Sequence, residues 1–241
     1  MLRKYSTNRT FEQNLLLGGI TATASGMVNV ASVMAFFAYT TNITGHVAVL
    51  AEEISKGHWH QVFIVGVWLF LFFIGGFLSS SIVINLNKYS AYYAHALPIF
   101  IEMLCLLFVA VYGHYFYHET LAETEYLIGL LLFSMGLQNG LTSSVSNFTV
   151  KTTHLTGLLT DLSVSISMFL KPDLRKNKVL VMKIKLLSTV AVFYLLGGVL
   201  GGLIFLKINF LVFYFVAAIL LLVLSYDFYN IGRVMIMRRK R

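Results

Sequence analysis

Residues 62–84 read VFIVGVWLFLFFIGGFLSSSIVI and contain no Asp, Glu, Lys, Arg or His. A helix that crosses a bilayer needs roughly 20 mostly apolar residues, so this stretch predicts a membrane-spanning helix. Stretches of similar length and composition recur on both sides of it, at residues 15–39, 94–115, 127–150, 186–206 and 208–229. We therefore expect an all-α integral membrane protein whose six transmembrane helices are joined by short loops.

The composition of the whole chain favours the same class of protein. Of its 241 residues, 58% are hydrophobic and only 12% are charged, and the mean hydropathy is +0.79. A soluble globular domain is less apolar and more charged than this. The first apolar stretch is longer than the roughly 7–15 apolar residues of a signal peptide, and no small-residue cleavage site accompanies it. We expect this stretch to be retained and residues 1–241 to form a single membrane domain.

The cysteine count and the net charge exclude several classes of partner. Cys105 is the only cysteine, so neither an intrachain disulfide nor a multi-cysteine metal site is expected. The formal net charge of +8 would indicate nucleic acid in a soluble protein. Here Lys and Arg gather beside the ends of the apolar stretches, where anionic lipid headgroups account for them. We expect the lipid bilayer, and no nucleic acid, as a partner.

The distribution of charge predicts the orientation of the chain in the membrane. Lys and Arg gather in residues 3–9, 171–185 and 233–241, whereas the loop at residues 118–125 has three Glu and neither Lys nor Arg. Cytoplasmic loops carry the excess of Lys and Arg. The three basic regions should therefore be cytoplasmic and the acidic loop external, with both termini inside.

Two further segments, residues 41–55 and 153–170, are expected to enter the membrane without crossing it. A crossing by residues 153–170 would place the basic region 171–185 outside. A crossing by residues 41–55 would exchange the sides of Lys88 and the acidic loop. Both segments are also more polar than the six long stretches. We interpret them as short re-entrant half-helices.

The two half-helices belong to an internal repeat. The sequence TTNITGH at residues 40–46 corresponds to TTHLTGL at residues 152–158. The preceding span has Gly-x-x-Asn in both halves, at residues 26–29 and 136–139, and the following span has a Gly-Gly pair, at residues 75–76 and 197–198. Each half then contains three crossings. An odd number inverts the second half, which predicts an inverted 3+3 repeat of roughly residues 13–116 and 124–231.

In this arrangement the starts of the two half-helices meet near the middle of the bilayer. Lipid cannot satisfy free backbone N–H and C=O groups at that depth, so irregular chain there must be covered by protein or line a polar cavity. Thr hydroxyls can cap the exposed N–H groups, and Gly permits close approach of the backbone. Two positive helix ends would then face a common centre.

The motifs Thr-Asn-x-Thr-Gly at residues 41–45 and Thr-Thr-x-x-Thr-Gly-x-x-Thr-Asp-Leu at residues 152–162 resemble those of the YoaK-type family. The resemblance covers nearly the whole chain. It implies a bacterial inner-membrane protein with six helices, and it implies no substrate, mechanism or catalytic residue, because the function of that family is unknown. His46 departs from the pattern, since relatives usually have Thr-Gly-Asn there.

The candidate substrate-binding residues are polar or lie beside the half-helix starts. Asp161 is the sharpest of them because an acid inside a membrane segment usually faces a cavity or a partner; the alternative is a packing carboxylate satisfied by neighbouring Thr hydroxyls or helices. Simple capping and interhelical hydrogen bonding are the alternatives for the others. The full set is Asn29, Thr41, Asn42, Thr44, Gly45, His46, Gln138, Asn139, Thr153, His154, Thr156, Gly157 and Asp161.

The remaining polar residues give weaker signals. Glu102 lies among Ile, Met and Leu and is either a proton relay, a partner of a cation such as His46, or a protonated side chain. The seven His residues show no metal-binding spacing, so no metal and no cofactor are expected. The Gly-Gly pairs are expected to allow close helix packing.

Two functions remain open. The first is a small transporter or channel for a small polar or ionic solute, with its site between the Thr-Gly half-helices. The second is a non-transporting scaffold or an intramembrane enzyme, although the known catalytic motifs are absent from the sequence and the loops are too short for a catalytic domain. We expect no enzyme activity, and the chain is compatible with a homo-oligomer.

Overall fold

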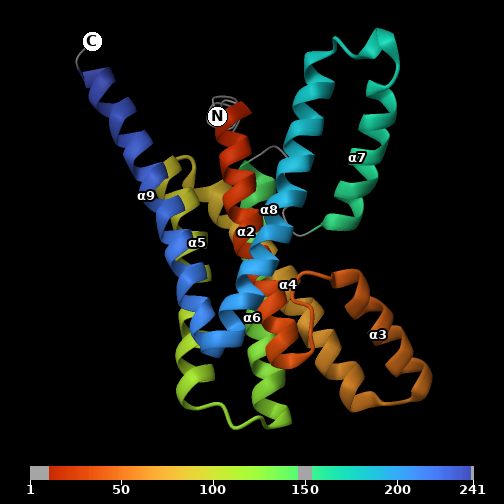
Figure 1. The fold of residues 1–241 in the computed structure, drawn as a ribbon. Coiled ribbons are helices and arrows are strands. Elements are labelled where there is room, and N and C mark those ends of the chain that lie inside the picture. The colour runs from red at the N-terminus through yellow and green to blue at the C-terminus, as the bar shows by residue number, and fades with distance from the viewer. Residues whose placement is uncertain (1–10, 146–153, 240–241) are drawn as a thin grey trace.

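A computed structural model describes residues 11–145 and 154–239 of this protein, and these residues form helices and short connections without any strand. Figure 1 shows their arrangement. The long helices are α2 (Phe11–Phe36), α4 (Trp59–Leu86), α5 (Ala91–Tyr115), α6 (Leu121–Val145), α8 (Lys178–Ile208) and α9 (Val212–Arg239). The shorter elements are α3 (Ile43–Lys56), α7 (Leu155–Phe169), η1 (Pro172–Leu174) and η2 (Asn209–Leu211).

The all-helical architecture expected from the sequence is confirmed. Four segments of the described chain are long and apolar enough to cross a membrane, namely Asn14–Phe36, Trp59–Leu86, Tyr92–Tyr115 and Lys178–Ser225. The last of these covers α8 and the first half of α9, which are separated by a sharp break at Asn209, where φ is +49°. Helix α6 is not among the four, and the polar residues of its second half, which include Gln138 and Asn139, lower its hydropathy.

Glycines allow the two most extensive helix contacts, which join α2 to α8 and α4 to α6. A Cβ added at Gly26 would collide with the Tyr194 carbonyl oxygen of α8. A Cβ added at Gly136 of α6 would collide in the same way with the Phe72 carbonyl oxygen of α4. Only glycine therefore permits such close approach of the backbones at these crossings.

The Gly-Gly pairs make the reciprocal contacts. A Cβ at Gly197 would meet the Thr23 carbonyl oxygen, and a Cβ at Gly75 would meet the Phe133 carbonyl oxygen. In the crossing of α2 with α8, Gly26 and Gly197 thus take the places that Gly136 and Gly75 take in the crossing of α6 with α4. The expectation that these glycines permit close packing agrees with both crossings.

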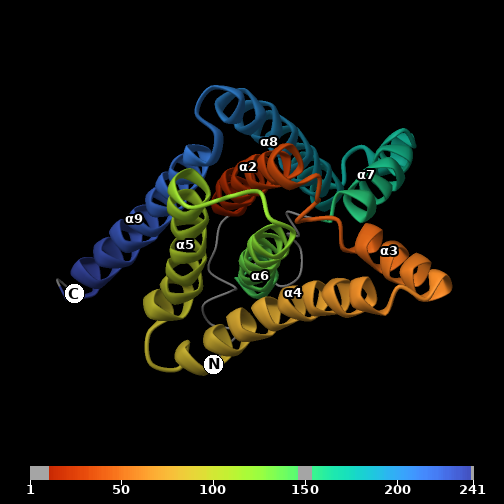
Figure 2. The same ribbon diagram turned by 90° about the horizontal axis from the view of Figure 1, so that it is seen from below.

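The other helices surround these two crossed pairs. Helices α5 and α9 contact each other and, with α2 and α6, enclose the main apolar core. Helix α3 packs on α4 and α7 packs on α8. Figure 2 shows α3 and α7 together on the side away from α5 and α9. The two short helices begin near each other and run toward opposite ends of the molecule, as Figure 1 shows.

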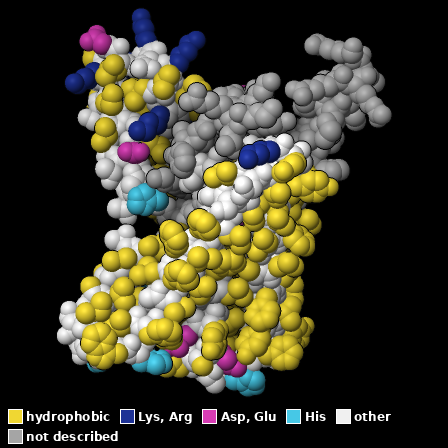
Figure 3. Space-filling view, turned by 180° about the vertical axis from the view of Figure 1, so that it is seen from behind, with side chains coloured by type: hydrophobic (Ala, Val, Ile, Leu, Met, Phe, Trp, Pro, Cys, Tyr) yellow, Lys and Arg dark blue, Asp and Glu magenta, His cyan; other side chains and the backbone are white. Residues whose placement is uncertain are grey.

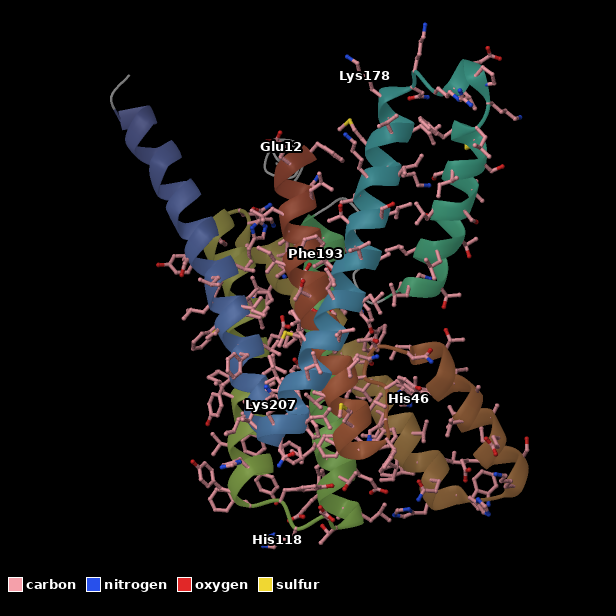
Figure 4. The ribbon with its side chains drawn as sticks, viewed as in Figure 1. Glu12, His46, His118, Lys178, Phe193 and Lys207 are labelled. Atoms are coloured by element: carbon pink, nitrogen blue, oxygen red, sulfur yellow. The ribbon has the colours of Figure 1, made fainter. Side chains whose placement is uncertain are left out.

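Charged and apolar side chains are segregated along the long axis of the molecule. Figure 4 places Glu12 and Lys178 near one end and His118 at the other. On the face shown in Figure 3, hydrophobic side chains cover the middle, and Lys and Arg gather toward one end. The basic region 171–185 and the acidic loop 118–125 therefore lie at opposite ends, which is the relative placement that the charge pattern predicts. Basic residues 3–9 lie outside the described residues.

Candidate functional site

The starts of α3 and α7 meet at a cavity of about 630 Å³. Segments from both halves line it: the last third of α2 and its connection to α3, the first turns of α3 and α7, the middles of α4 and α8, and the last third of α6. The lining residues are Asn29, Tyr39, Thr41, Asn42, Ile43, Thr44, Phe72, Asn139, Ser143, His154, Leu155, Thr156 and Tyr194. None of these described residues is Asp, Glu, Lys or Arg, and they offer amides, hydroxyls, aromatic rings, one imidazole and the aliphatic side chains of Ile43 and Leu155.

Asparagine side chains fix the chain where it leaves α2 and enters α3. The Asn29 Oδ1 atom accepts hydrogen bonds from the backbone N–H groups of Thr40, at 3.0 Å, and Thr41, at 3.1 Å. The Asn42 Oδ1 atom accepts one from the Gly45 N–H, at 3.1 Å, and so caps α3. Both amide side chains line the cavity, and the oxygen of each accepts hydrogen bonds from backbone N–H groups. Asn42 therefore has the capping role considered for it.

The start of α7 differs from that of α3. His154 occupies the N-cap position but makes no side-chain capping bond. Its ring lies over Gly157, where an added Cβ would meet Cδ2 and Nε2 at 2.6 Å, just as Asn42 lies over Gly45. The imidazole is exposed to the cavity, as is the hydroxyl-bearing side chain of Thr156. Among the described residues, the N-cap side chain therefore caps the first turn of α3 but not that of α7.

One side-chain hydrogen bond across the cavity joins the two halves. The hydroxyls of Thr41 and Tyr194 lie 2.7 Å apart, and both side chains are buried. Tyr194 stands three residues before Gly197 in α8, and Phe72 stands three residues before Gly75 in α4. Phe72 is therefore the counterpart of Tyr194 and lines the same cavity, but it has no hydroxyl.

Seven of the residues predicted from the sequence line this cavity. They are Asn29, Thr41, Asn42, Thr44, Asn139, His154 and Thr156. Gly45 lies beneath the Asn42 amide at the start of α3, and Gly157 lies beneath the His154 ring at the start of α7. Thr153 lies outside the described residues. Which of these groups contact a solute remains a prediction.

Two predicted residues are buried elsewhere and have structural partners. His46 Nε2 bonds to the Tyr39 carbonyl oxygen, at 2.6 Å, and its ring packs edge-on against Trp68. Gln138 joins α6 to α2: its Oε1 accepts from the Ser25 hydroxyl and its Nε2 donates to the Thr21 carbonyl oxygen. Gln138 therefore forms interhelical hydrogen bonds, which the sequence analysis gave as the alternative to solute binding.

Asp161, the sharpest candidate in the sequence, lies outside the cavity. Its side chain is 61% exposed and its Oδ2 atom lies 3.7 Å from Lys183 Nζ on α8. About 1.7 turns separate it from the start of α7, and this rotates it toward the flank of α7 beside α8. The ammonium group of a neighbouring helix therefore lies beside the carboxylate, which agrees with the alternative of a packing carboxylate.

Glu102 also lies away from the cavity. It is buried within α5, 1% exposed, and its Oε1 has no hydrogen-bond partner among the described residues. His46, one of the cations considered as its partner, is instead bonded to the Tyr39 carbonyl oxygen. The described residues contain no group of three His, Cys, Asp or Glu side chains placed to hold a metal ion.

Sequence reasoning missed the aromatic part of the wall. Tyr39, Phe72 and Tyr194 look like ordinary apolar or interfacial residues of membrane helices. An alignment of the Gly-Gly pairs would have matched Phe72 with Tyr194 and identified them as equivalent positions. The Tyr194 hydroxyl would then have been recognised as a group that its counterpart Phe72 lacks.

Together these features define an all-helical protein, rich in apolar helices of membrane-spanning length, with a polar cavity between two short helices. The family model described as "Protein of unknown function (DUF1275)" matches residues 17–226, and the chain belongs to this family. The match spans both halves and every residue of the cavity. No curated protein and no solved structure matches the chain.

Proposed function

We propose that this protein is a small-solute transporter or channel of the bacterial inner membrane, with six membrane-spanning helices, two re-entrant half-helices and cytoplasmic termini. The recurrence of the glycine crossings, α2 with α8 and α6 with α4, supports an inverted 3+3 repeat. The opposite directions of α3 and α7 support it as well. In proteins built this way, solute sites lie where discontinuous helices meet near the bilayer midplane.

The observation that carries this proposal is the cavity that both half-helix starts form. Its volume of about 630 Å³ falls within the range of sites for small molecules. Polar groups from both halves converge on it, whereas a scaffold would have no need of a polar space among apolar helices. We therefore place the solute site between Thr44 and Asn42 on one side and His154 and Thr156 on the other.

The wall favours an uncharged polar or an anionic solute. Among the residues that the structure describes, no Asp or Glu lines the cavity, so this part of the wall holds no fixed negative charge to attract a cation. The N-termini of two helices point into it and carry partial positive charge. Hydroxyls and amides can exchange hydrogen bonds with a polar solute, and Phe72 and Tyr194 can cover its apolar surface. No enzyme activity and no cofactor form part of this proposal.

Flux through reconstituted protein tests the proposal. The full chain in proteoliposomes is assayed with a panel of small inorganic anions, carboxylates and uncharged polyols, beside protein-free vesicles. We expect protein-dependent flux of at least one class. The double variant Thr44→Val/Thr156→Val removes one cavity hydroxyl from each half at nearly constant volume, and should reduce this flux by about tenfold, the effect of losing roughly 1.4 kcal/mol of hydrogen bonding.

Thr23→Val is the matched control. Within the described part of the chain, its hydroxyl bonds to the Gly19 carbonyl oxygen of α2, at 2.9 Å, and Thr23 is not among the residues that line the cavity. It should leave the flux unchanged. Absence of flux across the panel, or equal flux for the double variant and the wild type, would favour the non-transporting scaffold instead.

A further inference from the structure

His154 supplies the only imidazole among the described residues of the cavity wall. Its side chain is exposed, and at the N-cap of α7 it makes no side-chain capping bond to the residues that the structure describes. A capping side chain would be bonded to the backbone of its own helix. This imidazole is not, so it can bind a solute in the cavity.

Gly157 allows the ring to lie where it does. A Cβ added at Gly157 would lie 2.6 Å from both Cδ2 and Nε2 of His154, so any side chain at this position would displace the ring. Glycine therefore lets the imidazole fold against the first turn of α7. Thr156, which also lines the cavity, lies in the same turn. The Thr-Gly motif thus places a hydroxyl and an imidazole at one part of the wall.

The first half carries an amide at the equivalent position. The repeat matches Asn42 with His154, and each side chain lies over the Gly at the third position of its helix. The Asn42 Oδ1 atom accepts from the Gly45 N–H, at 3.1 Å, and caps α3. An amide is uncharged at every physiological pH, whereas an imidazole becomes positively charged when it is protonated. The two halves of the wall therefore differ in the charge that they can carry.

The other groups that face this imidazole across the cavity are uncharged. Tyr39 and Tyr194 are the remaining titratable residues of the described wall, and phenols are neutral near pH 7. Helices α4 and α6 contribute Phe72, Asn139 and Ser143, which do not titrate. A protonated imidazole would therefore be the only formal charge among the described lining residues.

Charged and titratable groups on the neighbouring elements do not line the described wall. Asp161 lies outside the cavity, with Lys183 of α8 3.7 Å from its carboxylate. His46, near the start of α3, is bonded to the Tyr39 carbonyl oxygen. Lys151 lies outside the described residues, and a variant described below tests its contribution separately.

We propose that protonated His154 binds the anionic group of a small solute in this cavity, so that the site selects anions and fills preferentially at acidic pH. The inference rests on the solute site proposed above and names its class of solute. A positive charge within a membrane protein needs a partner of opposite charge or water. No described lining residue supplies that charge, so the solute does, and it favours the proton on the imidazole in return. The anion and the proton bind together.

Binding to the full chain purified in detergent tests this inference without any flux. The probes for isothermal titration calorimetry are nitrate, methanesulfonate and benzenesulfonate, anions of strong acids that differ in size and keep their charge, with erythritol as an uncharged probe. We expect at least one anion to bind about tenfold more tightly at about pH 5.5 than at about pH 8, because histidine changes charge over this range and only the protonated fraction is competent. The affinity for erythritol should not follow pH.

Two substitutions of His154 give opposite expectations. His154→Asn gives α7 the residue that α3 carries at the equivalent position, and the gain in affinity at acidic pH should disappear. His154→Lys keeps a positive charge over the whole range, so it should bind the anion equally well at both pH values. His58→Gln is the matched control, because His58 is exposed, lies 2.8 Å from Glu53 and is not among the residues that line the cavity. His58→Gln and Lys151→Gln should both behave as the wild type.

The inference is overturned if no anion binds the wild type, or if the affinity for each anion is the same at both pH values. It is also overturned if Lys151→Gln loses the gain while His154→Asn, with unchanged helicity, retains it. Failure here and failure of transport remain distinguishable. Flux of a polyol without anion binding would refute the role of His154 alone. Acid-dependent anion binding without flux would support this role and refute transport.

Discussion

Tyr194 provides a direct residue-level test of how the two halves are held together. Tyr194→Phe removes the hydroxyl that bonds Thr41 at 2.7 Å and leaves the Thr41 hydroxyl buried without this partner. We expect the free energy of unfolding to fall by about 1–2 kcal/mol. Tyr214→Phe in α9, a position 37% exposed, should change it by less than about 0.5 kcal/mol. The measurement is thermal unfolding in detergent.

A double-mutant cycle separates the hydrogen bond from general loss of packing. Thr41→Val alone and with Tyr194→Phe should give a coupling free energy of about 0.5–1.5 kcal/mol. Strictly additive effects of the two substitutions would show that the bond across the cavity contributes nothing.

The Glu123 carboxylate should make the stability of the acidic loop depend on pH. Its carboxylate accepts hydrogen bonds from the His118 N–H, at 2.9 Å, and the Tyr112 hydroxyl, at 3.0 Å, and these lower its pKa to about 2. A depressed pKa means that the stabilisation is complete above the ordinary value of 4.5 and is lost as pH falls from there toward about 2. Amide hydrogen exchange at His118 should therefore accelerate over this range. In Glu123→Gln it should be fast at every pH, and a wild-type rate following only the intrinsic pH dependence would contradict the assignment.

Among single residues, polarity in an apolar context was the signal that the sequence offered. It identified Asn29, Asn42 and His154 because such groups need partners inside a membrane segment. It could not place Asp161, since the side of α7 that a residue occupies depends on how the helix packs against α8. It also could not distinguish Tyr194 from a lipid-facing aromatic.

The helix crossings make a sharp prediction about glycine. Gly26→Ala and Gly136→Ala each bring a Cβ into a carbonyl oxygen of the crossing helix, which cannot move as a flexible side chain does. We expect each to destabilise the protein by about 1–3 kcal/mol. Gly66→Ala in α4 is the control, because a Cβ there meets nothing within 4 Å. It should be neutral or stabilising by up to about 1 kcal/mol through helix propensity. Equal effects of all three on thermal unfolding would show that the crossings are looser than described.

The helical elements were largely predictable, because apolar length and charge constrain them strongly. The segments expected at residues 41–55 and 153–170 agree with α3 (Ile43–Lys56) and α7 (Leu155–Phe169) to within two residues at each end. The break between α8 and α9 lies at Asn209, slightly later than the sequence indicated, because Ile208 is still helical and Asn209 tolerates the positive φ. Which helices cross could not be read from composition, since Gly-Gly pairs indicate close contact without naming the partner.

For the molecule as a whole, the recurring Thr-Gly motifs were visible in the sequence, but the placement in space of the helices that carry them was not. The matching Thr-Gly motifs predicted that the half-helices approach each other. That both lie at one side follows from their packing on α4 and α8, which no local pattern encodes. The cavity between them depends on that packing.

Everything proposed for this cavity requires α3 and α7 to enter the membrane from opposite sides. Single cysteines at His60, Glu119 and Lys176, on the Cys105→Ala background, report the side of each loop through a membrane-impermeant maleimide. All three positions are exposed. We expect His60→Cys and Glu119→Cys to react from one side of sealed vesicles and Lys176→Cys only from the other. Labelling of His60→Cys and Lys176→Cys from the same side would contradict the inverted arrangement and the site built on it.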